Sequence, residues 1–295
     1  MLKTADIQIR DPFILVSDGF YYLYGTTDKD CWDKVPGCGF DTYRSKNLAD
    51  WEGPFPAFRP SKDFWGKHNF WAPEVYSYKG AFYMFASFIG EKGDGTNRGT
   101  AILRAEKPEG PFTPWSDGAV TPKEWMCLDG TFYIDKNDDP WIVFCHEWVQ
   151  IRDGTICAQR LSHDLKKAEG EAVTLFKASD ATWSKGFESN KLPGSCHVTD
   201  GCNMFAMKNG KLLMQWSTIG FEGYCIGYAV SESGSVTGPW KQSSEPVFKK
   251  DGGHGMLFRT FDGKLMLTIH QPNDTPNERA IFIEVEETED GIRRK

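Results

Sequence analysis

Five segments of the chain share one pattern of hydrophobic and polar positions. Each consists of a short apolar run, a polar turn that contains Gly or Asp, and a second apolar run. The five segments begin at Asp11, Glu74, Asp129, Asp200 and His254. Two apolar runs joined by such a turn are typical of a β-hairpin. Strong helical periodicity is absent from the sequence, so the pattern predicts an all-β protein.

The spacing of these hairpins predicts how they are arranged. The five starts lie 54 to 71 residues apart, and each interval can hold a four-stranded antiparallel sheet. Sheet repeats of this size are typical of β-propellers, so we expect a five-bladed β-propeller. A two-sheet sandwich is the alternative, but sandwiches do not produce five long, self-similar units. Because no Pro/Gly/Ser-rich linker divides the chain, residues 1–295 are expected to form a single domain.

Composition and charge narrow the classes of function. The chain has 34 Lys and Arg against 41 Asp and Glu, a net charge of −7, and no long basic patch, which argues against nucleic acid as a partner. It has no apolar run of about 18 residues, so no membrane span is expected. An apolar leader is not evident either, and we expect a cytoplasmic protein. Aromatic residues reach 14%, and their flat faces suit sugar rings as well as protein cores.

The starts of the five hairpins carry the candidate chemistry. The innermost strands of propeller blades begin around one axis, so the four carboxyls and the imidazole at these positions are expected to point to a common centre. Grouped carboxyls raise each other's pKa and destabilise the fold, and such clusters usually mark function, although any one of them could merely cap a turn. Hydrolysis of a glycosidic bond needs one protonated and one ionised carboxyl, and a third acid can keep the first protonated.

The same segments resemble glycoside hydrolase family 43. The resemblance runs from about residue 7 to 285 and rests on motifs in the family's order and spacing: Arg10-Asp11-Pro12, Trp71-Ala72-Pro73-Glu74, Leu128-Asp129-Gly130, Thr199-Asp200-Gly201 and Gly253-His254-Gly255. It implies a five-bladed propeller that hydrolyses glycosidic bonds with inversion, mostly in arabinofuranosides and β-xylosides of plant cell walls. We therefore expect an exo-acting enzyme whose partner is an oligosaccharide containing one of these sugars.

The resemblance also implies roles for three acids. Asp11 matches the general base, Asp129 the residue that tunes and orients the acid, and Asp200 the general acid. Position 200 departs from the family, which usually has Glu in a Glu-Gly-Pro-like motif, and the shorter side chain sets the carboxyl roughly 1.5 Å back. Three readings stay open: Asp200 acts from a shifted backbone, Glu188 replaces it, or the chain is a non-catalytic or very weakly active carbohydrate-binding propeller. A glycoside phosphorylase would need a phosphate site, to which Arg10, His197 and Arg279 could contribute.

Further positions are candidates for contact with sugar or with a cation. By the resemblance, Trp71 lines the sugar site and Arg279 reaches substrate hydroxyls, although Arg279 could instead form a surface salt bridge. Phe13 shares a strand face with Asp11. The other candidates, each with a packing role as its alternative, follow the inner hairpins: Asp28, Trp32, Phe40, Phe70, Phe88 and Trp148. No cofactor is expected to be required, but the resemblance implies a calcium-like cation near His254, with a structural histidine as the alternative.

Overall fold

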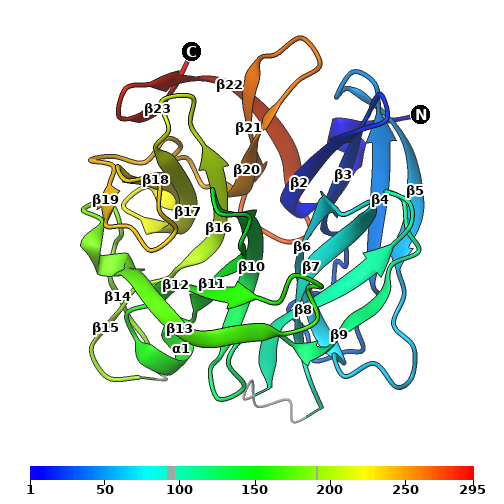
Figure 1. The fold of residues 1–295 in the computed structure, drawn as a ribbon, viewed down its shortest axis with the longest axis horizontal. Coiled ribbons are helices and arrows are strands. Elements are labelled where there is room, and N and C mark those ends of the chain that lie inside the picture. The colour runs from blue at the N-terminus through cyan, green and yellow to red at the C-terminus, as the bar shows by residue number, and fades with distance from the viewer. Residues whose placement is uncertain (92–96, 191) are drawn as a thin grey trace.

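The chain folds into five antiparallel sheets arranged around a central axis (Figure 1). The computed structural model describes residues 1–91, 97–190 and 192–295. Each predicted hairpin forms the two innermost strands of one sheet, so the prediction of a five-bladed β-propeller is confirmed. Among the described residues no helix is long and apolar enough to cross a membrane.

The blades follow one another along the chain. Blade 1 consists of β2 (Arg10–Ser17), β3 (Phe20–Thr26), β4 (Phe40–Ser45) and β5 (Asp50–Phe58), with β1 (Leu2–Lys3) on its outer edge. Blade 2 consists of β6 (His68–Tyr78), β7 (Ala81–Ile89), β8 (Arg98–Ala105) and β9 (Thr113–Ala119). Blade 3 consists of β10 (Cys127–Ile134), β11 (Pro140–His146), β12 (Thr155–Leu161) and β13 (Ala168–Lys177).

Blade 4 consists of β16 (Asp200–Ala206), β17 (Leu212–Gly220), β18 (Gly223–Ser231) and β19 (Trp240–Gln242). Blade 5 consists of β20 (Gly253–Arg259), β21 (Leu265–Gln271), β22 (Arg279–Thr288) and β23 (Gly291–Arg294). The remaining elements are short: the helix α1 (Trp148–Ile151), the paired strands β14 (Phe187–Glu188) and β15 (Ser195–Cys196), and 3₁₀ turns at Thr4–Asp6 and Ala178–Asp180.

Blades 1 and 5 meet without sharing a strand. Trp51 of blade 1 stacks on Phe282 of blade 5, with ring centroids 6.4 Å apart. The Arg279 guanidinium donates to the backbone carbonyl of Ala5 (2.7 Å) and to those of two residues in its own loop. Side-chain packing and hydrogen bonds to the backbone therefore close the ring here, and Arg279 is part of that closure.

Aromatic side chains fill the space between blades 1 and 2. Phe88 is fully buried and contacts Phe70 edge-on, with centroids 4.7 Å apart, and Phe40 lies 6.0 Å from both rings. Phe13 is buried as well and packs edge-on against Tyr76, 5.1 Å away. These four phenylalanines were candidates for sugar contact, and the structure places all of them in the core. The same residue types serve packing and sugar binding, so sequence alone does not separate the two uses.

Besides an extra bulge at Asn69 in β6 (φ 53°), every inner strand has in its first half a bulge in which one residue adopts a left-handed conformation. These residues are Asp11 (φ 54°), Ala72 (48°), Asp129 (54°), Gly201 (55°) and His254 (42°). The conformation costs about 1–2 kcal/mol for a residue other than glycine, so it needs support from other contacts. A repeated hydrogen bond provides that support.

In blades 1, 2, 3 and 5, the amide N–H of the left-handed residue donates to a side chain near the end of the second strand of the preceding blade. The acceptors are, in blade order, His270 (3.1 Å), Thr26 (2.8 Å), Ser87 (2.8 Å) and Ser217 (2.8 Å). In blade 4 the amide of Gly201 donates instead to the carboxylate of Asp129, at 2.9 Å. The bulges therefore fix the axial side chains, and blade 4 is anchored differently from the rest.

Candidate active site

A cavity of about 650 Å³ lies at the end of the propeller where the inner strands begin. Asp11, Asp129, Asp200 and His254 line it together, as the hairpin starts predicted. Its rim comes from the segments that join the second and third strands of the blades, which contribute Trp32, Lys34, Glu147, Trp148, Val149, Asn273, Asp274 and Thr275. The inner strands thus supply the floor of the cavity, and these connecting segments supply its walls.

Asp11 is held as a carboxylate. Its Oδ1 lies 3.1 Å from Nδ1 of His254, and its Oδ2 accepts a hydrogen bond from the Thr26 hydroxyl at 2.7 Å. Burial alone would raise the pKa of Asp11, but His254, Arg10 and the Thr26 hydroxyl outweigh it and leave the pKa below its ordinary value. An ionised, fixed carboxylate is what a general base requires.

Asp129 and Asp200 have the opposite tendency. Burial raises the pKa of Asp129 to about 7, and Asp200 and Asp11 add to that effect. The pKa of Asp200 is raised too, by its depth in the cavity and by Asp11, while His254 and the Tyr224 hydroxyl, which donates to Asp200 at 3.1 Å, oppose the shift. The two carboxyls therefore retain a proton to higher pH than Asp11 does.

Gly201 connects these two acids through the backbone. It directly follows Asp200, and its amide donates to Asp129. A Cβ on Gly201 would lie 2.6 Å from Cγ of His254, so the imidazole packs against a position that only glycine can occupy. The Asp-Gly pair therefore brings a carboxyl, a backbone donor and the axial histidine into one small volume.

His254 has a raised pKa in this setting. Burial would lower its pKa, but Asp11, Asp129 and Asp200 raise it above its ordinary value. Its Nδ1 lies 3.1 Å from Asp11 and 3.7 Å from Asp129, so this atom faces the two carboxyls. Among the described residues no group of three or more His, Cys, Asp or Glu is arranged to hold a metal ion. The calcium-like cation stays a prediction, and no step below depends on it.

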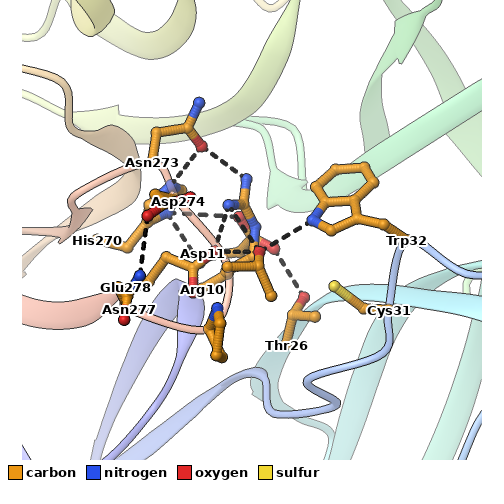
Figure 2. Close-up of polar contacts among 12 residues, drawn as sticks. Arg10, Asp11, Thr26, Cys31, Trp32, His270, Asn273, Asp274, Asn277 and Glu278 are labelled. Carbon is orange, nitrogen blue, oxygen red and sulfur yellow. Dashed lines mark hydrogen bonds and ion pairs between the residues drawn. The ribbon is translucent and has the colours of Figure 1, made fainter.

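A polar network joins blades 1 and 5 beside Asp11 (Figure 2). Arg10 pairs with the buried Glu278 at 2.6 Å and donates to Asn273 at 2.8 Å. Its guanidinium lies 4.9 Å from the ring centroid of Trp32, whose Nε1 donates to the Thr275 hydroxyl at 3.0 Å. The loop that carries Trp32 is therefore fastened to the 272–278 segment of blade 5.

His270 belongs to the same network, and its hydrogen bonds fix its tautomer. The Asp11 amide donates to Nδ1, so the proton lies on Nε2, which donates to Asn273 at 3.2 Å. Burial lowers the pKa of His270 to about 3, which keeps the ring neutral. His270 therefore orients the backbone of the proposed base and does not compete with His254 as a cation.

A second ion pair lies on the blade 2–blade 3 side of the cavity. Arg98 pairs with Glu147, and its guanidinium lies 5.3 Å from the ring centroid of Trp71. Trp71 in turn contacts Trp32, with centroids 5.4 Å apart. Trp71, predicted to line the sugar site, and Trp148 both line the cavity. Arg10, Trp32, Trp71 and Arg98 thus form one continuous wall of stacked cations and aromatic rings.

The structure does not bring every candidate residue to the cavity. Asp28 accepts backbone hydrogen bonds from Asp30 (3.0 Å) and Cys38 (3.3 Å) and so shapes its own loop. Glu188, the alternative acid, is exposed in β14 outside the cavity lining. Phe13, Phe88 and Arg279 are in the core or the blade closure, as described above. Of the three residues suggested for a phosphate site, only Arg10 lines the cavity, whereas His197 contacts Ser184 elsewhere.

Glu74 also differs from expectation. It is buried, accepts a hydrogen bond from the Tyr76 hydroxyl, and lies outside the cavity lining. Burial raises its pKa to about 7. The blade 2 counterpart of Asp11 is Ala72, two residues earlier, so the axial cluster that faces the cavity has three carboxyls.

Several cavity residues were not found from the sequence. They lie at the ends of second and third strands or in the segments between them: Arg98, Glu147, Tyr224 and Asn273. The candidate residues had been taken from the starts of the hairpins, which do not include these positions. Each second strand ends on the face of the propeller where the inner strands begin. Polar and aromatic residues just after these strand ends are therefore the sequence signal for the cavity walls. The floor of the cavity can therefore be predicted from the starts of the hairpins, whereas its walls must be sought between the second and third strands.

Comparison with known proteins supports this geometry. The chain matches the sequence model of "Glycosyl hydrolases family 43" over residues 5–292. It is 24% identical over 159 residues to the extracellular exo-alpha-(1->5)-L-arabinofuranosidase ArbA of Cellvibrio japonicus, a match that spans 49% of this chain and 42% of that protein.

Solved structures extend the likeness over the whole chain. An endo-arabinase from Bacteroides thetaiotaomicron VPI-5482 is 40% identical, with 98% of both chains covered and a TM-score of 0.90. A thermostable family-43 glycoside hydrolase is 25% identical, with 98% of this chain and 93% of that one covered and a TM-score of 0.82. The chain therefore belongs to glycoside hydrolase family 43 and is an inverting glycoside hydrolase.

Proposed function

We propose that this protein hydrolyses α-L-arabinofuranosidic bonds in arabinan-derived chains, with Asp11 as base and Asp200 as acid. One observation carries the assignment of roles: the two carboxyls line the same cavity, and their pKa values are displaced in opposite directions. Two titratable groups separated in this way provide the acid and the base that the reaction needs. The relatives named for arabinose favour this sugar over β-xylosides.

The reaction follows from these assignments. The Asp11 carboxylate accepts a proton from water as the water oxygen attacks the anomeric carbon, from the side opposite the leaving oxygen. Asp200 donates its proton to that oxygen as the carbon–oxygen bond breaks. One water is consumed, and the configuration at the anomeric carbon inverts. Asp129 and Asp200 disfavour two negative charges in one site, so the pair retains a proton that Asp200 can donate.

We further propose exo action, supported by the fastened side of the cavity. The hydrogen bond between Trp32 and Thr275 joins two rim segments across blades 1 and 5. Arg10 and Asn273 reinforce that contact just above Asp11. In this proposal a terminal sugar lies against this wall and the rest of the chain leaves over blade 4, where the described residues form no such connection between rim segments.

The test is hydrolysis of linear α-1,5-arabinan and β-1,4-xylan, followed by proton NMR and by product sizing. The expected result is hydrolysis of arabinan, with a β-configured sugar as the first product and arabinose released from the start of the reaction. Preference for xylan would overturn the choice of sugar. A ladder of oligosaccharides at early times would overturn exo action and leave the acid–base assignment standing.

A further inference from the structure

The rim of the cavity is low over blade 4, compared with three other blades. In three other blades, the segments that join the second and third strands contribute residues to the cavity wall: 27–39, 147–154 and 272–278. In blade 4 this connection is a two-residue turn, Phe221 and Glu222, between Gly220 and Gly223. The cavity therefore has a wall on its other described sides and an edge at the β17–β18 hairpin.

An exposed aromatic ring occupies that edge. The Phe221 side chain is 71% exposed, although large apolar side chains are usually buried. Ile219, two residues earlier near the end of β17, lines the catalytic cavity. Gly220, Phe221 and Glu222 line a separate hollow of about 210 Å³. One hairpin thus forms the boundary between the two spaces.

The lining of the hollow suits a sugar. Trp183, Phe221 and Pro246 give it apolar surface, and a Lys249–Glu222 ion pair (3.0 Å) provides polar groups at its edge. Sugar rings present apolar C–H faces and a rim of hydroxyls, which match an aromatic platform flanked by charged and polar groups. The same hairpin borders both spaces, Ile219 lining the catalytic cavity and Phe221 the hollow, and this proximity indicates the occupant, which is more of the same glycan chain.

The position of the acid indicates which part of the chain lies there. Asp200 begins the inner strand of blade 4, and Asp200 pairs in register with Ser217 on the strand that leads to Phe221. The acid protonates the leaving oxygen, so the leaving part of the substrate lies on the acid's side of the bond. We propose that Phe221 and the hollow behind it bind the leaving-group portion of the glycan. The inference rests on the proposed function in taking a chain of pentose units as substrate.

The test compares a long substrate with one that has no chain on the leaving side. For Phe221→Ala, kcat/KM for arabinohexaose should fall about tenfold, equivalent to ~1.4 kcal/mol, whereas kcat/KM for 4-nitrophenyl α-L-arabinofuranoside should not change. The matched control is Phe261→Ala. Phe261 is also exposed (52%) but lies in the β20–β21 hairpin at the opposite end of its blade, so neither substrate should be affected. Equal effects of Phe221→Ala on both substrates, or none on either, would overturn the proposal.

A second arm separates this inference from the choice of sugar. If the wild type cleaves xylohexaose and 4-nitrophenyl β-D-xyloside instead, the proposed sugar is wrong, and the same comparison on those substrates decides the role of Phe221. If the wild type cleaves neither pair, calorimetric binding of the two hexasaccharides decides it. Weaker binding by Phe221→Ala than by Phe261→Ala would support the subsite, and equal or absent binding would overturn it.

Discussion

Blade 4 differs from the other four blades in the group that accepts the hydrogen bond from the left-handed residue of its bulge. In blades 1, 2, 3 and 5, a neutral side chain of the neighbouring blade accepts the hydrogen bond from the left-handed residue of the bulge. In blade 4 that acceptor is Asp129, an acid of the active site. Four anchors therefore hold only the shape of the propeller, whereas the fifth couples the backbone beside Asp200 to an ionisable group of the active site.

Blades 1 and 4 also differ in how they shift the pKa of the acid that each contributes to the cavity. Asp11 in blade 1 lies among His254, Arg10 and the Thr26 hydroxyl, and its pKa is lowered. Asp200 in blade 4 has a tyrosine hydroxyl as its hydrogen-bond donor, and its pKa is raised. Blade 1 is thus suited to hold a negative charge and blade 4 to hold a proton. The rim follows this division, since it is fastened near Asp11 and low near Asp200.

The largest expected effect comes from removing either carboxyl. Asp11→Asn should lower kcat by about 10³-fold on every substrate, because all of them need an activated water. Asp200→Asn should cause a similar loss on arabino-oligosaccharides but a much smaller one on 4-nitrophenyl α-L-arabinofuranoside, whose leaving group needs no proton. Steady-state kinetics on both substrates measure the difference.

Glu188→Gln is the control for that comparison, because this exposed carboxyl was the alternative acid. It should retain the kcat of the wild type on both substrates. Equal losses on the two substrates in Asp200→Asn, or a selective loss on oligosaccharides in Glu188→Gln, would contradict the assignment of the acid to blade 4.

Gly201→Ala tests the special anchor of blade 4 with a smaller expected effect. The new Cβ would lie 2.6 Å from Cγ of His254 at a φ of 55°. Displacing the catalytic groups by about 1 Å can cost about 10²-fold in rate, so kcat should fall by about that factor. The control is Gly210→Ala, at φ 85° with nothing within 4 Å, which should lose about 1–2 kcal/mol of stability but keep its kcat. Wild-type kcat in Gly201→Ala would show that the close packing is dispensable.

The hairpins could be predicted from the sequence, whereas the bulges at the starts of their inner strands could not. The hairpins were predictable because alternating apolar runs and their turns are local signals. The bulges were not, since an inserted residue changes direction without changing composition. Glu74 was therefore predicted as the blade 2 counterpart of Asp11, although the equivalent position is Ala72. Asp200 was likewise predicted as the counterpart of Asp129, although Gly201 holds that place.

The walls of the cavity were less predictable than its floor. Arg98 and Glu147 meet only because blades 2 and 3 are adjacent, and they are far apart in sequence. Trp71 and Phe88 lie in the two paired strands of the second hairpin, yet the Phe88 ring is in the core and the Trp71 ring lines the cavity. Their separation depends on the twist and packing of whole sheets, which no local pattern contains.

The pH profile tests the same contrast through the ionisation of the two sides. Asp11 must be ionised and its pKa is lowered, so kcat/KM should hold until the pH falls below about 4, the usual range of an aspartate. Asp200 must be protonated and burial raises its pKa, so kcat/KM should decline only as the pH rises above the usual range of an aspartate, about 4. The acidic limb then reports on blade 1 and the basic limb on the Asp129–Asp200 pair.

Tyr224→Phe should move only one of these limbs, and by the smallest amount considered. The Tyr224 hydroxyl donates to Asp200, which stabilises the carboxylate and lowers its pKa. Removing that donor favours the protonated acid, so the basic limb should move to higher pH, by up to about one unit, while the acidic limb stays in place. Tyr228→Phe, on the same strand but outside the cavity lining, should move neither limb. A shift of the basic limb to lower pH, or of the acidic limb instead, would show that Asp200 is not the group that must stay protonated.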